Sequence, residues 1–164
     1  FHNSCDAWMI KLIVVGKIKE KALESLIQDY IKRIQPFSKI LIEEIKDEPN
    51  YEDEAKNLQS LIKESQLILS KITKDDQVIL LELRGKLIDS IELSEHMDKA
   101  MTYGSKNIVF VIGGSLGVHE DVRQRANILW KLSANTFPHG IVRLLVLEQI
   151  YRAFKILNNQ TYHK

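Results

Sequence analysis

The sequence contains a single cysteine, Cys5, among 164 residues. An intrachain disulfide is therefore impossible, and no cluster of cysteine and histidine has the spacing of a zinc site. No apolar run approaches the roughly 20 residues that span a bilayer, and residues 1–8 lack the apolar centre of a signal peptide. These absences exclude a disulfide framework and a helix that spans a membrane, and they favour a reducing, cytoplasmic location.

An excess of charge of one sign is also missing, because the formal net charge is only +1. The charge is unevenly distributed: residues 118–164 hold seven Lys and Arg against three Asp and Glu. We expect sequence-independent affinity for nucleic acid to be weak, with a Kd of roughly 0.1 mM to 1 μM or poorer. The carboxyl-terminal part is the candidate face for a polyanion, and shape must supply the rest of the recognition.

Length and composition fit one globular domain, since 45% of the residues are hydrophobic and 27% are charged. Residues 1–8 have no periodicity and precede Met9, the natural start of a clean strand pattern. We therefore expect residues 1–8 to be a leader or cloning remnant and residues 9–164 to form a single domain.

The most informative stretch is NIVFVIGGSLGVHEDV, at residues 107–122. Its first half is an unbroken β-branched and aromatic run, typical of a strand buried on both faces of a parallel sheet. Gly113, Gly114 and Gly117 follow, and glycines there let the backbone turn sharply and approach a ligand. The GGxxG spacing is neither the GxGxxG dinucleotide fingerprint nor a P-loop, and the acidic residues that follow argue against a phosphate. We predict a small-molecule site here, with a plain glycine-rich connection as the alternative.

Hydrophobic periodicity predicts five strands that alternate with five helices. The strands are expected at residues 10–15, 40–45, 78–83, 108–112 and 128–132, and the helices at residues 20–34, 55–72, 90–104, 120–127 and 141–158. Ser90 is expected to cap the third helix, and Arg84, Gly85 and Lys86 are expected to end the third strand. This order predicts an α/β sandwich with a mostly parallel sheet.

Three segments are expected to meet at the carboxyl edge of this sheet, where open α/β sheets bind ligands: residues 81–86, 113–117 and 132–140. In the third segment, His139 follows Pro138, and it either shapes the loop or takes part in catalysis. Glu148 and Arg152 lie four residues apart on one helix, a spacing that usually means a surface ion pair. The sequence has no Ser/His/Asp triad, HExxH helix or acidic metal cluster, so we expect no metal.

Several long, ordered motifs resemble one known family. They are residues 9–21, 78–86 and 110–127, and above all TFPHGIVRLLVLEQIYRAFKI and the terminal YHK. These motifs resemble the RlmH family of ribosomal large-subunit pseudouridine N3-methyltransferases, members of the SPOUT superfamily, and the resemblance covers residues 9–164. It implies an α/β sheet whose carboxyl-terminal part is threaded as a trefoil knot, which general rules on chain connections would not suggest.

The resemblance also implies S-adenosylmethionine as methyl donor, held in the knot and shared with the second subunit of a homodimer. By motif match, the cofactor-binding positions are Leu81, Gly113, Leu132, Ser133, Ala134, Asn135, Thr136 and Phe137. We expect residues 133–135 to contribute backbone groups, and the apolar members to form a slot for adenine.

The implied reaction is direct methyl transfer from a sulfonium to N3 of a pseudouridine in 23S ribosomal RNA. It requires alignment of the reacting atoms and removal of the imide proton, without a covalent intermediate or a metal. The unranked candidates for the catalytic role are His139, Arg143, Glu148, Tyr162 and His163, and water is an alternative base. RNA phosphates or base carbonyls would meet Arg143, Arg152 and Lys164. The substrate is expected to be the large subunit or the assembled ribosome.

The last predicted helix is apolar nearly all round at its start, more than a surface helix of a small monomer needs. The residues concerned are Ile141, Val142, Leu144, Leu145, Val146 and Leu147. We therefore expect a homodimer that buries part of this helix. Two other functions compete with the methyltransferase: a non-catalytic α/β nucleotide or RNA-binding module, and a Rossmann-type oxidoreductase, which the GGxxG spacing disfavours.

Overall fold

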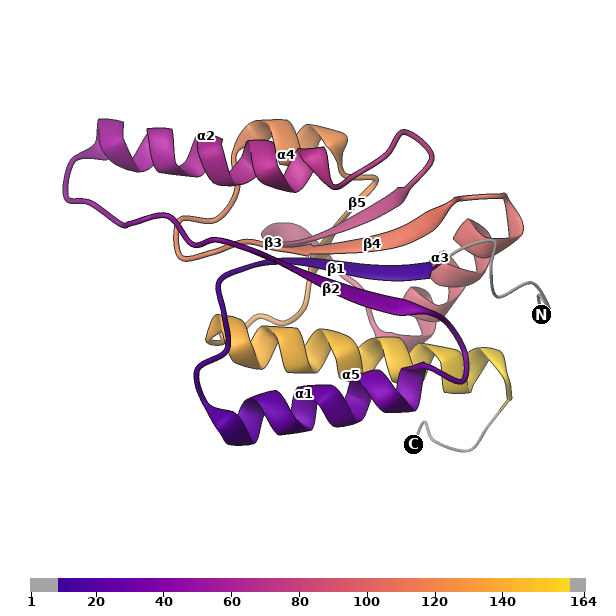
Figure 1. Cartoon of the computed structure of the whole chain (residues 1–164). Coiled ribbons are helices and arrows are strands. Elements are labelled where there is room, and N and C mark those ends of the chain that lie inside the picture. The colour runs from indigo at the N-terminus through magenta and orange to yellow at the C-terminus, as the bar shows by residue number, and fades with distance from the viewer. Residues whose placement is uncertain (1–8, 160–164) are drawn as a thin grey trace.

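A computed structural model describes residues 9–159, in which five strands alternate with five helices (Figure 1). The strands are β1 (Met9–Val15), β2 (Ile40–Ile45), β3 (Gln77–Leu87), β4 (Asn107–Ile112) and β5 (Ile128–Lys131). The helices are α1 (Lys21–Ile34), α2 (Glu54–Ser70), α3 (Ser90–Thr102), α4 (Glu120–Arg125) and α5 (His139–Leu157). The order of elements predicted from periodicity is confirmed.

The five strands form one sheet in the order β2-β1-β4-β3-β5, and every neighbouring pair is parallel. Helices α1, α3 and α5 cover one face of the sheet, and α2 and α4 cover the other (Figure 1). All six residues of the central strand β4 are buried, as its unbroken apolar run predicts. Because the strands are parallel, their carboxyl ends share one edge, and residues 81–84 of β3 meet the loops after β4 and β5 there.

Each face of the sheet has its own hydrophobic core, and β4 contributes to both. Ile108, Phe110 and Ile112 pack in the core beneath α1, α3 and α5, whereas Val109 and Val111 pack in the core beneath α2 and α4. This alternation follows from the two-residue period of a strand. The sheet is therefore fixed from both sides, which makes the carboxyl edge a rigid support for a site.

The prediction that residues 84–86 end the third strand is wrong, because β3 continues to Leu87. The pairing of β3 with β5 shifts register between Leu81 and Lys86, both of which pair with Trp130. A Cβ on Gly85 would lie 2.5 Å from the carbonyl oxygen of Leu129, so only glycine lets the two backbones approach this closely. The sequence Arg-Gly-Lys looks like a turn, but it is a bulge inside a strand.

Two helix starts also differ from the prediction. The cap of α3 is Asp89, whose carboxylate accepts a hydrogen bond from the backbone N–H of Glu92 at 2.8 Å, and Ser90 is already the first helical residue. Helix α5 begins at His139, directly after Pro138, whose carbonyl oxygen accepts from the N–H of Val142 at 2.9 Å. His139 therefore lies in the first turn of a helix, not in a loop.

None of the helices between residues 9 and 159 combines the length and the hydropathy that a membrane crossing requires.

Candidate active site

A pocket of about 590 Å³ lies at the carboxyl edge of the sheet, within the roughly 300–1,000 Å³ usual for small-molecule sites. It is built by the end of β3, the loop after β4, and the loop after β5 with the first turn of α5. The lining residues are Leu81, Glu82, Leu83, Arg84, Ile112, Gly113, Gly114, Ser115, Leu116, Gly117, Val118, Arg123, Trp130, Leu132, Ser133, Asn135, Thr136, Phe137, His139 and Val142. The three segments expected at this edge thus line a single pocket.

Seven of the eight residues that the resemblance assigns to the cofactor line this pocket, and Ala134 is the exception. Ala134 is exposed, at a turn where the backbone N–H of Asn135 donates to the hydroxyl of Ser133 at 3.0 Å. The position of the other seven agrees with a donor site, and their contacts with the donor stay a prediction.

The glycine loop after β4 forms a tight wall of backbone. The N–H of Gly117 donates to the carbonyl oxygen of Gly114 at 3.0 Å, and Gly117 has a positive φ of 77° that favours glycine. A Cβ on Gly113 would lie 2.8 Å from the carbonyl oxygen of Gly117 and 3.0 Å from Cγ1 of Val118. The absence of a side chain at residue 113 is therefore required by the loop itself, before any ligand is considered.

Trp130 gives the pocket an apolar and rigid base. Its side chain is only 1% exposed, and its indole N–H donates to the carbonyl oxygen of Ile88 at 3.2 Å. Its ring meets Phe110 edge-on, with the ring centroids 6.2 Å apart. Leu81 and Leu132 line the same pocket, so the interior offers the apolar surface that an adenine ring needs.

One side of the pocket carries a charged group that the sequence analysis missed. Glu82 accepts hydrogen bonds on Oε1 from Nε of Arg84 at 3.0 Å and from Nε of Arg123 at 3.2 Å. Arg123 also contacts Glu120 at 3.3 Å within α4. Glu82 is an acidic residue at the end of a buried strand, and that position is the signal that points to it; nothing in the sequence marks Arg123 as its partner.

His139 lies at the pocket, at the start of α5, and its side chain is exposed. The imidazole makes no hydrogen bond or ion pair with any residue in the described part of the chain. Of the proposed catalytic residues that the structure describes, His139 is the one that lines the pocket. An imidazole exchanges protons near neutral pH, so this position suits proton transfer to or from a bound substrate.

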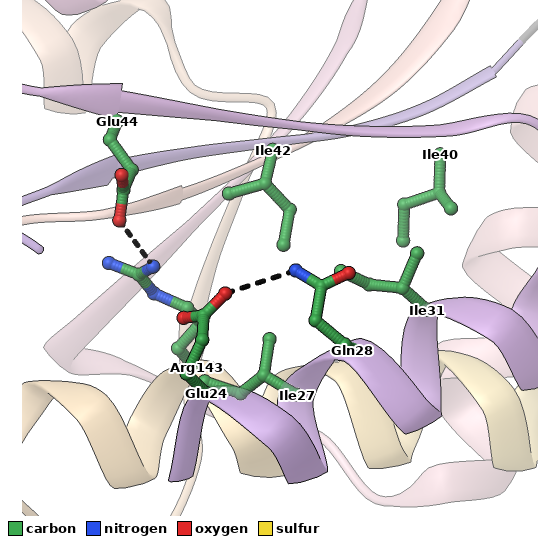
Figure 2. A pocket seen from close by; sticks show the side chains of 8 residues that line it. All are labelled: Glu24, Ile27, Gln28, Ile31, Ile40, Ile42, Glu44 and Arg143. Atoms are coloured by element: carbon green, nitrogen blue, oxygen red, sulfur yellow. Dashed lines mark hydrogen bonds and ion pairs between the residues drawn. The ribbon is translucent and has the colours of Figure 1, made fainter. Parts of the chain in front are cut away.

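Arg143 does not reach the pocket, although it lies one helical turn beyond His139. Its guanidinium is buried and donates from Nη1 to Glu44 Oε2 at 2.8 Å and from Nη2 to the carbonyl oxygen of Gly16 at 3.1 Å. Figure 2 shows Arg143 directed at Glu44 across a separate cleft of about 370 Å³ between α1 and β2. With its donors engaged in this way, Arg143 holds elements of the fold together.

Glu148 and Arg152 form the ion pair that their spacing predicts. Arg152 donates from Nη2 to Glu148 Oε2 at 3.0 Å and from Nε to Oε1 at 3.2 Å. Glu148 lies nine residues after His139 on α5, which corresponds to about 13 Å along the helix axis. A single chain therefore does not bring Glu148 or Arg152 to the pocket, and their proposed roles stay predictions.

The three candidates in the tail, Tyr162, His163 and Lys164, lie outside the described residues. Within residues 9–159, no group of three or more His, Cys, Asp or Glu side chains is arranged to hold a metal ion.

A parallel sheet with helices on both faces and a glycine-bordered pocket beyond its strand ends defines an α/β protein that binds a small molecule at that edge. A family model described as "Predicted SPOUT methyltransferase" matches residues 9–163. The ribosomal RNA large subunit methyltransferase H of Bacillus pumilus (strain SAFR-032) is 46% identical over 157 residues, which cover 94% of this chain and 99% of the relative.

Among solved structures, a probable methylase family protein from Haemophilus influenzae Rd KW20 matches with a TM-score of 0.50 at 18% identity, over 98% of this chain and 71% of that chain. This likeness shows a shared fold. The SpoU methyltransferase AviRb from Streptomyces viridochromogenes, solved with the cofactor AdoMet, is more distant, with a TM-score of 0.44 at 8% identity over 90% of this chain and 60% of its own.

The chain belongs to the SPOUT methyltransferase family, and within that family it belongs to the group of ribosomal RNA large subunit methyltransferase H. The resemblance seen in the sequence motifs is confirmed. The chain is thus an enzyme that uses S-adenosylmethionine as methyl donor, and the non-catalytic module and the oxidoreductase are excluded.

The pocket fits this donor in size and in chemistry. Its apolar interior suits an adenine, and the loop at residues 132–137 and the glycine loop offer backbone donors and acceptors. The wall at Gly113 has no room for a Cβ, so a ligand there meets backbone directly. Leu81, Gly113 and the pocket-lining residues of the 132–137 loop would hold the donor.

Proposed function

We propose that this enzyme methylates N3 of a pseudouridine in 23S ribosomal RNA, and that its substrate is the large subunit or the assembled ribosome. Family membership supports the rRNA methyltransferase activity. The domain is small and carries a net charge of only +1, so it lacks the broad basic surface that grips naked RNA unaided. On a structured particle the enzyme can recognise the shape of the folded RNA, which adds binding energy that its small net charge does not provide.

The observation that carries this proposal is the single pocket built from three strand ends, with His139 at its border. When bound, S-adenosylmethionine supplies an activated methyl group on a sulfonium sulfur. Trp130, Leu81 and Leu132 provide an apolar base for it. Thr136 and Phe137 line the same space and would fix the donor's orientation, so that the chain's main task is alignment.

Methyl transfer to N3 would exchange the carbon–sulfur bond of the donor for a carbon–nitrogen bond, and a side chain or water would accept the imide proton of the pseudouridine. His139 suits this role because its imidazole is exposed at the pocket and engaged with no other described residue. Arg84 and Arg123 lie on the opposite, β3 and α4, side of the pocket and add positive charge next to Glu82. Tyr162 and His163 stay candidates for the same proton, as does water.

We infer that the enzyme acts as a homodimer, with the carboxyl-terminal segment threaded as a trefoil knot. Glu148 and Arg152 are about 13 Å and about 20 Å from His139 along α5, so only a second copy would bring them to a pocket. Leu87 and Ile91 are 57% and 50% exposed, and they flank Ser90, whose hydroxyl donates to Gln149 of α5 at 2.5 Å. This exposed apolar surface supports burial against a partner.

Mass mapping of 23S rRNA tests the proposed function. Large subunits and assembled ribosomes that lack the modification are incubated with the enzyme and methyl-labelled S-adenosylmethionine, and the RNA is then digested and sequenced by mass. We expect one labelled nucleotide, an N3-methylated pseudouridine, and at least 100-fold slower labelling with His139→Ala. Label on another atom or base, or equal labelling of free uridine-rich RNA, would contradict the proposal. A monomeric mass by light scattering at micromolar protein concentration would contradict the proposed homodimer.

A further inference from the structure

The connection between β1 and α1 lies beside the pocket, although the two are far apart in the sequence. β1 runs to the same carboxyl edge as β3, β4 and β5, and the chain then turns at Gly16, whose φ is +101°. Figure 1 shows this indigo connection passing the start of α5. The residues of the connection therefore border the helix that presents His139.

Two kinds of contact fix the connection against α5. A Cβ on Gly140 would lie 2.8 Å from Cδ2 of Leu23 and 3.1 Å from Cδ1 of Ile18, so both side chains press on the helix at the residue after His139. In addition, Arg143 donates to the carbonyl oxygen of Gly16 at 3.1 Å. The connection is thus held in one place next to the pocket.

The exposed side chains of the connection and the first residue of α1 are mostly positive. Lys17, Lys19 and Lys21 fall within five residues, and all three are exposed. None of them makes a hydrogen bond or an ion pair with a residue in the described part of the chain, whereas Lys63, placed elsewhere on the surface, pairs with Glu48 at 3.3 Å. Glu20 is the single acid within this stretch. The surface therefore offers concentrated positive charge that no described side chain neutralises.

We propose that Lys17, Lys19 and Lys21 form a phosphate-binding surface that holds the backbone of the substrate RNA beside the pocket. The inference rests on the proposed function, because an RNA that places a base at His139 brings its own phosphates to this edge of the sheet. Lysines bind phosphates as mobile point charges and carry no base specificity, so this surface positions the strand while the pocket selects the base. It supplies local attraction that the net charge of +1 does not.

The test compares two triple variants with the same change in charge. The first replaces the three loop lysines, as Lys17→Gln, Lys19→Gln and Lys21→Gln. The matched control is Lys74→Gln, Lys99→Gln and Lys106→Gln, three exposed lysines at the opposite, amino edge of the sheet. Methyl transfer to unmodified ribosomal particles is measured over a range of salt concentrations, and donor affinity is measured by calorimetry with S-adenosylhomocysteine.

We expect the loop variant to raise KM for the particle at least tenfold, with kcat and donor affinity within twofold of wild type. The slope of log KM against log salt should fall by about 2, at ~0.7 for each single-strand phosphate that the variant no longer neutralises. Restoring charge as Lys17→Arg, Lys19→Arg and Lys21→Arg should restore KM. Equal KM and equal salt slopes in the loop variant and the control would overturn the proposal.

Filter binding of the same particles separates this inference from the proposed function. If wild type binds the particle but labels no pseudouridine, the proposed function fails, and the binding difference between the two triple variants still decides the role of the lysines. If wild type labels pseudouridine and both triple variants bind the particle equally, the inference about the lysines is contradicted and the proposed function is kept.

Discussion

Arg143, in the last helix, donates a hydrogen bond to the carbonyl oxygen of Gly16, 127 residues earlier in the chain, at 3.1 Å. The same guanidinium donates to Glu44 at 2.8 Å, so one buried side chain joins α5 to the ends of β1 and β2. This contact connects the helix that presents His139 to the connection that carries the lysine surface.

Replacing Arg143 with Met should destabilise the fold by about 1–3 kcal/mol, because it removes two hydrogen bonds and leaves Gly16 without this partner. The expected loss of unfolding free energy is smaller than for a fully buried ion pair, because Glu44 is 37% exposed and water can replace part of the interaction. Urea unfolding measures the change, and Arg33→Met, which removes an exposed ion pair with Asp29, is the control. Wild-type stability together with lost methyl transfer would instead place Arg143 in contact with the substrate.

Gly113→Val should abolish binding of S-adenosylhomocysteine. The added Cβ would meet the carbonyl oxygen of Gly117 at 2.8 Å, so the loop that borders the pocket must move. Calorimetry measures the affinity, and circular dichroism checks that the variant is folded. The control is Ala55→Val, which adds a branched side chain at an exposed residue of α2. Normal binding by a folded Gly113 variant would show that the donor lies elsewhere.

Much of the site follows from the sequence, because parallel strands end at a common edge. Residues 113–117 and all of residues 132–137 except Ala134 line one pocket for that reason. The features of the site that the sequence does not predict depend on contacts between segments that are far apart in the chain. Gly85 looks like a turn residue, and only the approach of Leu129 makes it part of a strand. In the same way, Arg123 reaches Glu82 across 41 residues, and no periodic pattern encodes that pair.

The three catalytic candidates on α5 lie in different surroundings because of helix geometry. His139, Arg143 and Glu148 read as one polar series in the sequence. Because a helix rises 1.5 Å and turns by about 100° per residue, Arg143 lies on nearly the same face as His139 but about 6 Å farther along the axis, and Glu148 lies on the opposite face. His139 lines the pocket, Arg143 turns toward Gly16, and Glu148 pairs with Arg152. A list of polar residues does not predict which face each one occupies until the neighbours of the helix are known.

Stability should depend on pH through Glu64, which is 1% exposed and whose Oε1 has no hydrogen-bond partner among the described residues. Burial raises the pKa of this carboxyl above its ordinary value of 4.5, and the nearby carboxylate of Asp47 adds to the rise, against the lowering effect of the N–H of Glu48. The folded protein therefore favours protonated Glu64. The stability that this provides is complete below pH 4.5 and is lost as pH rises through the raised pKa of the folded state.

Glu64→Gln removes this dependence, so the variant should gain free energy of unfolding relative to wild type as pH increases from 4.5 to 8. Urea unfolding at several pH values measures the difference, and Glu95→Gln, at an exposed residue of α3, is the control. A difference between Glu64→Gln and wild type that stays constant over this range would show that Glu64 titrates normally.

Deleting residues 162–164, which lie outside the described part of the chain, should lower methyl transfer at least tenfold, a loss of roughly 1.4 kcal/mol in transition-state stabilisation. The deleted Tyr, His and Lys combine a ring that stacks on bases, an imidazole and a cation suited to phosphate. Light scattering and calorimetry should find dimerisation and donor affinity unchanged. Full activity in the truncated protein would shift the substrate role to His139 and Arg152.

The position of the bound donor tests the central claim most directly. We expect a crystal structure with S-adenosylhomocysteine to show the ligand between Leu81, Gly113 and Thr136, with its sulfur on the side of the pocket bordered by His139. A ligand bound in the cleft between α1 and β2, beside Arg143 and Glu44, or at any other surface, would contradict the assignment of the active site.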